Sequence, residues 1–250
     1  MAILEGLEPP CGLKQLVITS YGGLRYPTWL VTNRLINLVS VTLSSCKRLD
    51  SLPPLGKLPF LTNLEFKVMP ALKLIGVELY ENADPVFPSL EFLKLELLEG
   101  CEEWSEAHIE QEEWLQQLPS LEELQFTRSE ELLSLPANLA NISSIKKLEI
   151  SSCPEIKSLP ENGLPMLLKE LIISQCPSLI ERCRKDEGAD WLKIAHIPYI
   201  QIDDQEIESM TRVSCSGAAA DHVCIGAGAE HDDDDNWGNE LNCKKVFYVL

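Results

Sequence analysis

The sequence lacks the segments that would place it in a membrane or in the secretory pathway. It has no run of eighteen apolar residues, which a membrane-spanning helix needs. Its first residues, M-A-I-L-E-G-L-E-P-P, have neither the basic start nor the apolar stretch of a signal peptide. The nine cysteines are odd in number, and without a secretory signal they are expected to be reduced thiols in a cytoplasmic protein.

The motifs of common enzyme classes are also absent. There is no G-x-x-x-x-G-K-[ST] phosphate loop, no G-x-G-x-x-G fingerprint and no G-x-S-x-G elbow. No Cys-x-x-Cys pair is present, and the four histidines lie singly in different segments, at His108, His196, His222 and His231. The sequence therefore predicts no enzymatic activity, no cofactor and no metal centre.

Aromatic residues and basic residues are both scarce. Aromatics make up 6% of a chain that is 45% hydrophobic, so its core must be built from aliphatic side chains, chiefly Leu. The formal net charge of −18 argues against nucleic acid or an anionic membrane as the main partner. The acidic excess is concentrated near the C-terminus, where residues 203–250 contain 11 acidic and 3 basic residues.

What the sequence does contain is a repeat of the form L-x-x-L-x-L-x-x-C/N. Successive copies begin 23 to 31 residues apart, and their phase is constant along the chain. This period and pattern are the leucine-rich-repeat signature. Seven copies begin at Leu13, Leu38, Leu61, Leu90, Leu121, Ile145 and Leu168, and a weaker eighth copy begins at Ile197.

Each copy predicts one short strand followed by an inward turn. The ninth position is Cys46, Cys153 and Cys176 in three copies, and we interpret these thiols as packing groups rather than catalytic, metal-binding or disulfide-forming ones. Proline follows the apolar residues of the return segment, as in Leu135-Pro136, and blocks regular helix there. The predicted fold is an α/β repeat, a leucine-rich-repeat solenoid (horseshoe) with a concave parallel β-sheet and a convex side of loop, 3₁₀ and short helix.

The repeats divide the chain into two predicted parts. Residues 1–203 form the repeat domain of about eight repeats, and residues 204–250 form an acidic, disordered tail. Two long steps in the repeat contain insertions, and residues 108–118 of the second are predicted to form a helix.

The x positions of stacked strands line one face in rows, where mixed polar side chains and occasional apolar ones suit a protein-binding surface. The alternative is that they form only a solvated face, which every solenoid needs. The candidate protein-binding residues are Thr62, Asn63, Glu65, Lys67, Glu91, Phe92, Lys94, Glu96, Glu122, Glu123, Gln125, Lys146, Lys147, Glu149, Lys169, Glu170 and Ile172.

Several strings resemble one family. L-P-P-L-G-K-L-P-F-L-T-N-L-E-F (52–66) with L-K-L-I-G (72–76), F-P-S-L-E-F-L-K-L (87–95) with C-E-E-W (101–104), and C-P-S-L-I-E-R-C (176–183) with D-W-L-K-I-A-H-I-P-Y-I-Q-I-D (190–203) are similar to the repeat domain of plant intracellular immune receptors. These are nucleotide-binding leucine-rich-repeat disease resistance proteins with coiled-coil N-termini. The resemblance as a whole covers about residues 4–203, and the tail resembles nothing we can place.

The resemblance implies a non-catalytic protein-recognition module for plant defence. Its partner would be a pathogen effector or a host protein under surveillance, or a nucleotide-binding domain in cis or in trans. The family's nucleotide-binding domain is missing, so the chain looks like a C-terminal fragment of such a receptor. The alternatives are a generic leucine-rich-repeat adaptor or a non-functional truncated receptor.

Overall fold

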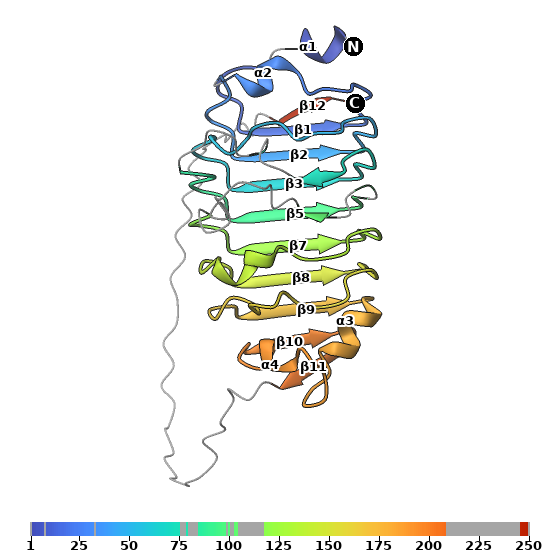
Figure 1. Ribbon diagram of the computed structural model, residues 1–250. Coiled ribbons are helices and arrows are strands. Elements are labelled where there is room, and N and C mark those ends of the chain that lie inside the picture. The colour runs from blue at the N-terminus through green and yellow to red at the C-terminus, as the bar shows by residue number, and fades with distance from the viewer. Residues whose placement is uncertain are drawn as a thin grey trace, which may run out of the picture.

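One strand from each repeat stacks beside the next in a single large sheet (Figure 1). The computed structural model describes residues 2–7, 9–32, 34–75, 79, 85–98, 100, 103–104, 118–208 and 246–249. The sheet has ten strands, in the order β11-β10-β9-β8-β7-β5-β3-β2-β1-β12. Eight of them come from the eight predicted copies: β1 (Gln15–Thr19), β2 (Ser40–Ser44), β3 (Asn63–Lys67), β5 (Phe92–Glu96), β7 (Glu123–Thr127), β8 (Lys147–Ser151), β9 (Glu170–Ser174) and β10 (Tyr199–Ile202).

Strands from outside the repeats pair with both ends of this sheet. At one end β11 (Gln205–Glu208) pairs antiparallel with β10, so the sheet continues past the predicted domain boundary at residue 203. At the other end β12 (Val246–Val249) pairs in parallel with β1. The rest of the predicted tail, residues 209–245, lies outside the described residues. The eight repeat strands are all mutually parallel, and the predicted parallel-sheet solenoid is confirmed.

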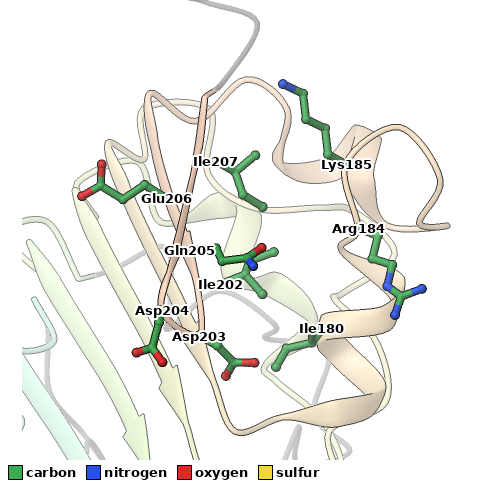
Figure 2. Close-up of a pocket in the computed structure, with 9 residues that line it drawn as sticks. All are labelled: Ile180, Arg184, Lys185, Ile202, Asp203, Asp204, Gln205, Glu206 and Ile207. Atoms are coloured by element: carbon green, nitrogen blue, oxygen red, sulfur yellow. The ribbon is translucent and has the colours of Figure 1, made fainter.

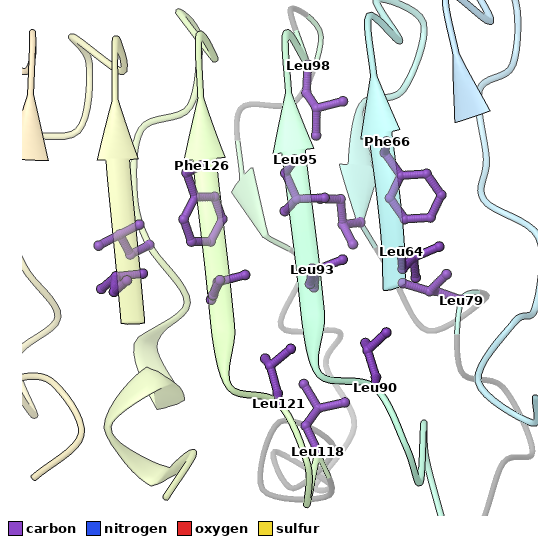
Figure 3. Close-up of a cluster of buried hydrophobic side chains, with 14 of the residues drawn as sticks. Leu64, Phe66, Leu79, Leu90, Leu93, Leu95, Leu98, Leu118, Leu121 and Phe126 are labelled. Atoms are coloured by element: carbon purple, nitrogen blue, oxygen red, sulfur yellow. The ribbon is translucent and has the colours of Figure 1, made fainter. Parts of the chain in front are cut away.

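The leucine positions of the repeat form one continuous core. No residue at the three apolar positions of any copy is more than 8% exposed. Figure 3 shows the middle of this core, where Leu64, Leu93 and Phe126 extend from neighbouring strands into the same layer. The repeat strands alternate half-buried and buried residues, because successive side chains point to opposite faces of a sheet, except that Thr127 at the end of β7 is also buried.

The return segments behind the core contain little helix, as predicted. The helices that lie wholly within the described residues are α1 (Ala2–Glu5), α2 (Thr28–Val31), the 3₁₀ helix η3 (Ala137–Asn141), α3 (Pro177–Arg182) and α4 (Trp191–Ile194). A small parallel sheet, which the sequence did not predict, pairs β4 (Leu74–Ile75) with β6 (Glu103–Trp104). Of the helix predicted over 108–118, only the buried Leu118 belongs to the described residues.

The turn after each strand has the same left-handed backbone conformation. From β1 to β9 the residue that follows the strand has a φ of 52° to 57°. Its N–H donates to the last carbonyl of the next strand, as Ser20 does to Ser44 at 2.8 Å and Val68 does to Glu96 at 2.9 Å. Six turns are joined in this way, so each turn fixes the position of the next repeat. Left-handed backbone is unfavourable for β-branched residues in particular, so Val68 is strained here.

Replacing Val68 with Asn should therefore stabilise the protein. We expect Val68→Asn to raise the free energy of unfolding by about 0.5–1 kcal/mol, because Asn tolerates the left-handed region. The control is Val17→Asn, at a half-buried strand position where a β-branched residue is preferred, and it should destabilise. Urea denaturation measures both, and equal changes in the two variants would contradict the argument.

A buried carboxylate holds the C-terminal repeats together. Asp190 is 0% exposed and accepts hydrogen bonds from Arg182 Nε at 2.8 Å, from Lys193 Nζ at 2.9 Å and from the N–H of Leu159 at 3.1 Å. Burial alone would raise its pKa, but these donors lower the pKa of Asp190 to about 2. The carboxylate thus links α3 and α4 to the preceding repeat.

This network should make stability depend on pH. Because the folded-state pKa of Asp190 is lowered, its contribution is complete above about pH 4 and is lost as the pH falls through about 2. We expect Asp190→Asn to cost roughly 2–3 kcal/mol at pH 7 in urea denaturation and much less near pH 2. Asp186→Asn, at an exposed position in the same loop, is the control and should change little. An Asp190→Asn cost that stays constant between pH 7 and pH 2 would contradict this assignment.

Candidate functional site

The solvent side of the large sheet carries all the predicted binding residues. We call it the strand face: it is formed by the first, third and fifth residues of each repeat strand and by the residue just before the strand. The strand positions are half-buried between their neighbours, whereas the preceding residues Glu91, Glu122, Lys146 and Lys169 are exposed. The structure therefore places the predicted residues on one surface.

The register of the strands arranges the strand face in rows. In the first row Asn63, Phe92, Glu123, Lys147 and Glu170 are neighbours from strand to strand. On β1 and β2 the strand positions are uncharged, with Gln, Val, Ser and Thr, and Lys14, just before β1, adds an exposed positive charge. From β3 to β9 the strand positions themselves carry charges, so the face has a nearly neutral half and a charged half.

Lys147, on β8, lies between two acidic neighbours in the charged half. Its Nζ is 3.6 Å from a carboxylate oxygen of Glu123 on β7 and 3.3 Å from one of Glu170 on β9. Partial burial alone would lower the pKa of Lys147, but the neighbouring carboxylates raise it above its ordinary value. Lys146 and Glu122, the residues just before β8 and β7, form a second ion pair between these repeats. The residues of β7, β8 and β9 therefore hold one another in place.

A second group of ion pairs lies on β3 and β5. Lys67 pairs with Glu65 on its own strand, and Lys94 Nζ is 3.2 Å from Glu96. Arg128, which follows β7 and was missed by the sequence prediction, also contacts Glu96 at 3.6 Å. Arg128 is the residue in the left-handed turn that directly follows its strand. This turn borders the strand face in each repeat from β1 to β9, so its position in the repeat could have identified Arg128.

The predicted residues therefore differ in whether their side chains already pair with neighbours or are left to contact a partner. Within the described residues, Glu91 and Lys169 are exposed and form no ion pair on the strand face, and Phe92 and Ile172 expose apolar surface. Glu149 accepts only a hydrogen bond from Ser151, at 3.2 Å. That these residues bind protein remains a prediction, but they are the ones whose groups are not already paired.

The strand face extends beyond the predicted residues at the C-terminal end. Tyr199 Oη lies 3.2 Å from oxygens of both Gln201 and Glu206, which joins β10 to the antiparallel β11. Behind this hairpin a pocket of about 700 Å³ opens against α3 (Figure 2). Arg184 and Lys185 line one side of the pocket and Asp203, Asp204 and Glu206 line the other, so it is charged with both signs.

The ninth-position cysteines occupy the core, as predicted. Cys46, Cys153 and Cys176 are 0% exposed and are free thiols. Each Sγ donates to a strand carbonyl, at 3.5 Å from Cys46 to Ser44, and Cys176 Sγ accepts the N–H of Cys153 at 3.4 Å. Burial raises the pKa of Cys46, and it raises that of Cys183 to about 12. These thiols satisfy backbone groups at the turn, which supports the packing interpretation.

Cysteine reactivity should follow this burial. We expect Cys11, which is exposed, to be alkylated by iodoacetamide in the native protein, and Cys46, Cys153, Cys176 and Cys183 to react only after unfolding. Peptide mass spectrometry after timed labelling measures each site. Rapid native labelling of Cys153 or Cys176 would contradict a packing role.

The described part of the chain contains no helix that is long and apolar enough to cross a membrane. Over the same ranges, no three His, Cys, Asp or Glu side chains group so as to hold a metal ion. His196, one of the four histidines, is hydrogen-bonded through Nε2 to the carbonyl of Pro165 at 3.2 Å.

The fold and the repeated strand face define a leucine-rich-repeat protein. Residues 1–69 match the family of R13L1/DRL21 leucine-rich repeats. Over most of its length the chain is also similar to plant disease resistance proteins, described next.

Three curated relatives support this assignment. A putative disease resistance protein of Arabidopsis thaliana is 33% identical over 179 residues, which cover 70% of this chain and 10% of that protein. The putative disease resistance RPP13-like protein 1 of Arabidopsis thaliana is 30% identical, with 71% and 19% covered. The putative disease resistance protein RGA1 of Solanum bulbocastanum is 26% identical, with 80% and 29% covered. The chain thus spans less than a third of the length of each.

A solved structure has the same fold. The leucine-rich-repeat domain of the type III effector XCV3220 (XopL) superposes with a TM-score of 0.56 at 16% identity. The match covers 77% of this chain and 69% of that one. At this identity the likeness shows the arrangement of strands and return segments only.

Proposed function

We propose that this chain is a non-catalytic protein-recognition module of plant defence, located in the cytoplasm, and that its strand face is the recognition surface. The partner is a pathogen effector, a host protein under surveillance, or the nucleotide-binding domain of a receptor. The similarity to disease resistance proteins supports the role, and the charged half of the strand face supports the surface.

One observation carries the proposal. The charged half presents charges that already pair with each other, beside a few exposed groups, Glu91 and Lys169 among them, that form no ion pair within the described residues. Paired side chains are already ordered, so a partner that docks on them pays little conformational entropy. The unpaired groups would then supply specificity through complementary charge.

The experiment isolates the partner and then tests the face. Proximity labelling with the full chain in pathogen-challenged plant tissue should recover an effector, a host target of effectors or a nucleotide-binding domain. Glu91→Lys and Lys169→Glu should each weaken the purified complex roughly tenfold, with a marked salt dependence. Surface plasmon resonance measures the dissociation constants.

The control is Lys157→Glu, an exposed lysine in a return segment behind the core. It changes the net charge as Lys169→Glu does but lies away from the strand face, so binding should stay within about twofold. Binding that is lost in the control and kept in both face variants would show that the partner uses another surface. Recovery only of partners unrelated to defence would favour a generic adaptor.

A further inference from the structure

The outer edge of β1 is occupied by the end of the chain itself. β1 pairs with β2 on one side and with β12 on the other, both in parallel. In Figure 1, β12 lies beside β1 at the same end of the sheet as α1. Most of the chain separates β12 from β1 in sequence, so this contact is not part of the repeat.

The register of β12 continues that of the repeat strands. Gln15 is the partner of Ser40 on β2, and Val246 is the partner of Gln15 in the same phase. Phe247 stands opposite Leu16 and Val249 opposite Ile18, the two buried positions of β1. The string Val-Phe-Tyr-Val has high strand propensity. Residues 246–249 therefore take the place that a preceding repeat strand would fill.

The pairing with β12 provides partners for the backbone amide groups at the outer edge of β1. Alternate residues of a strand direct their N–H groups toward the same neighbouring strand. Because the N–H of Ser20 donates to β2, the N–H groups of Leu16 and Ile18 also face β2. The N–H groups of Gln15 and Val17 then face β12, and in return those of Phe247 and Val249 face β1. Unpaired edge amides are a template for aggregation, and β12 covers them.

The helices at this end cover side chains instead. Leu4 of α1 and Trp29 of α2 are both 3% exposed, and Trp29 Nε1 donates to the carbonyl of Leu4 at 2.8 Å.

The chain is also long enough for β12 to come from the same molecule. Residues 209–245 span up to about 120 Å when extended, and the ten-stranded sheet is about 45 Å across.

We infer that the outer edge of β1 is a strand-addition site, and that residues 246–249 of the same chain are its resident, detachable cap. The ligand class is an extended peptide that adds in parallel and has apolar residues at alternate positions. Backbone hydrogen bonds supply the affinity of such sites and alternate side chains supply the specificity. This inference is independent of the strand face and of its proposed partner.

Hydrogen exchange at residue resolution by NMR tests the inference in the full chain. In Phe247→Pro the N–H that faces β1 is removed, so the Val17 amide should exchange roughly tenfold or more faster than in the unmodified chain. The Ile18 amide faces β2 and should keep its protection, which also shows that the first repeat is still folded. A synthetic peptide of residues 244–250 should restore the protection of Val17 when added in excess to the variant.

The matched control is Tyr248→Pro, whose N–H faces away from β1 and which an edge strand should tolerate. It should leave the exchange of Val17 unchanged. The inference is overturned if Val17 exchanges equally fast in the unmodified chain and in Phe247→Pro, or if both proline variants have the same effect. A dimer in light scattering, with Val17 protection that rises with protein concentration, would assign the edge to a second copy and overturn the resident cap.

Discussion

The hydrogen bond from each left-handed turn to the next strand is the contact on which the stack depends. A single repeat cannot bury its apolar edge, so its strand, turn and core positions become stable only when a neighbour fixes them. The turn residue does this directly, because its N–H reaches the last carbonyl of the following strand. The buried ninth-position thiols then satisfy the carbonyls next to this turn. In the three repeats with a ninth-position cysteine, core packing and backbone pairing thus meet at the turn.

The same stacking determines what the strand face can present. Because neighbouring strands are in register, side chains at equal repeat positions lie next to each other, and opposite charges pair across strands as Lys147 does with Glu123 and Glu170. The strand face therefore presents an ordered lattice of charges on β3 to β9 and, apart from Lys14, a neutral surface on β1 and β2.

The sequence was sufficient to predict the eight repeat strands, the core and the membership of the strand face, because all three follow from the spacing of Leu13, Leu38 and their equivalents. It was not sufficient for the ion pairs, since partners such as Lys147 and Glu170 are decided by register. The network of Asp190 with Leu159 was missed because it joins residues far apart in sequence. The pairing of β12 was missed because Val246–Val249 carries no repeat motif.

The two ends of the stack differ in a way that bears on how such genes change. At the C-terminal end Asp203 adopts the left-handed conformation one position early, and its side chain, not a following strand, accepts the N–H of Gln175 at 2.9 Å. The chain then reverses into the antiparallel β11, so no further unit can be added after it in the same phase. Duplication or loss of whole units is therefore compatible with the fold in the interior of the array, whereas a unit added after β10 would find the outer edge of that strand already paired.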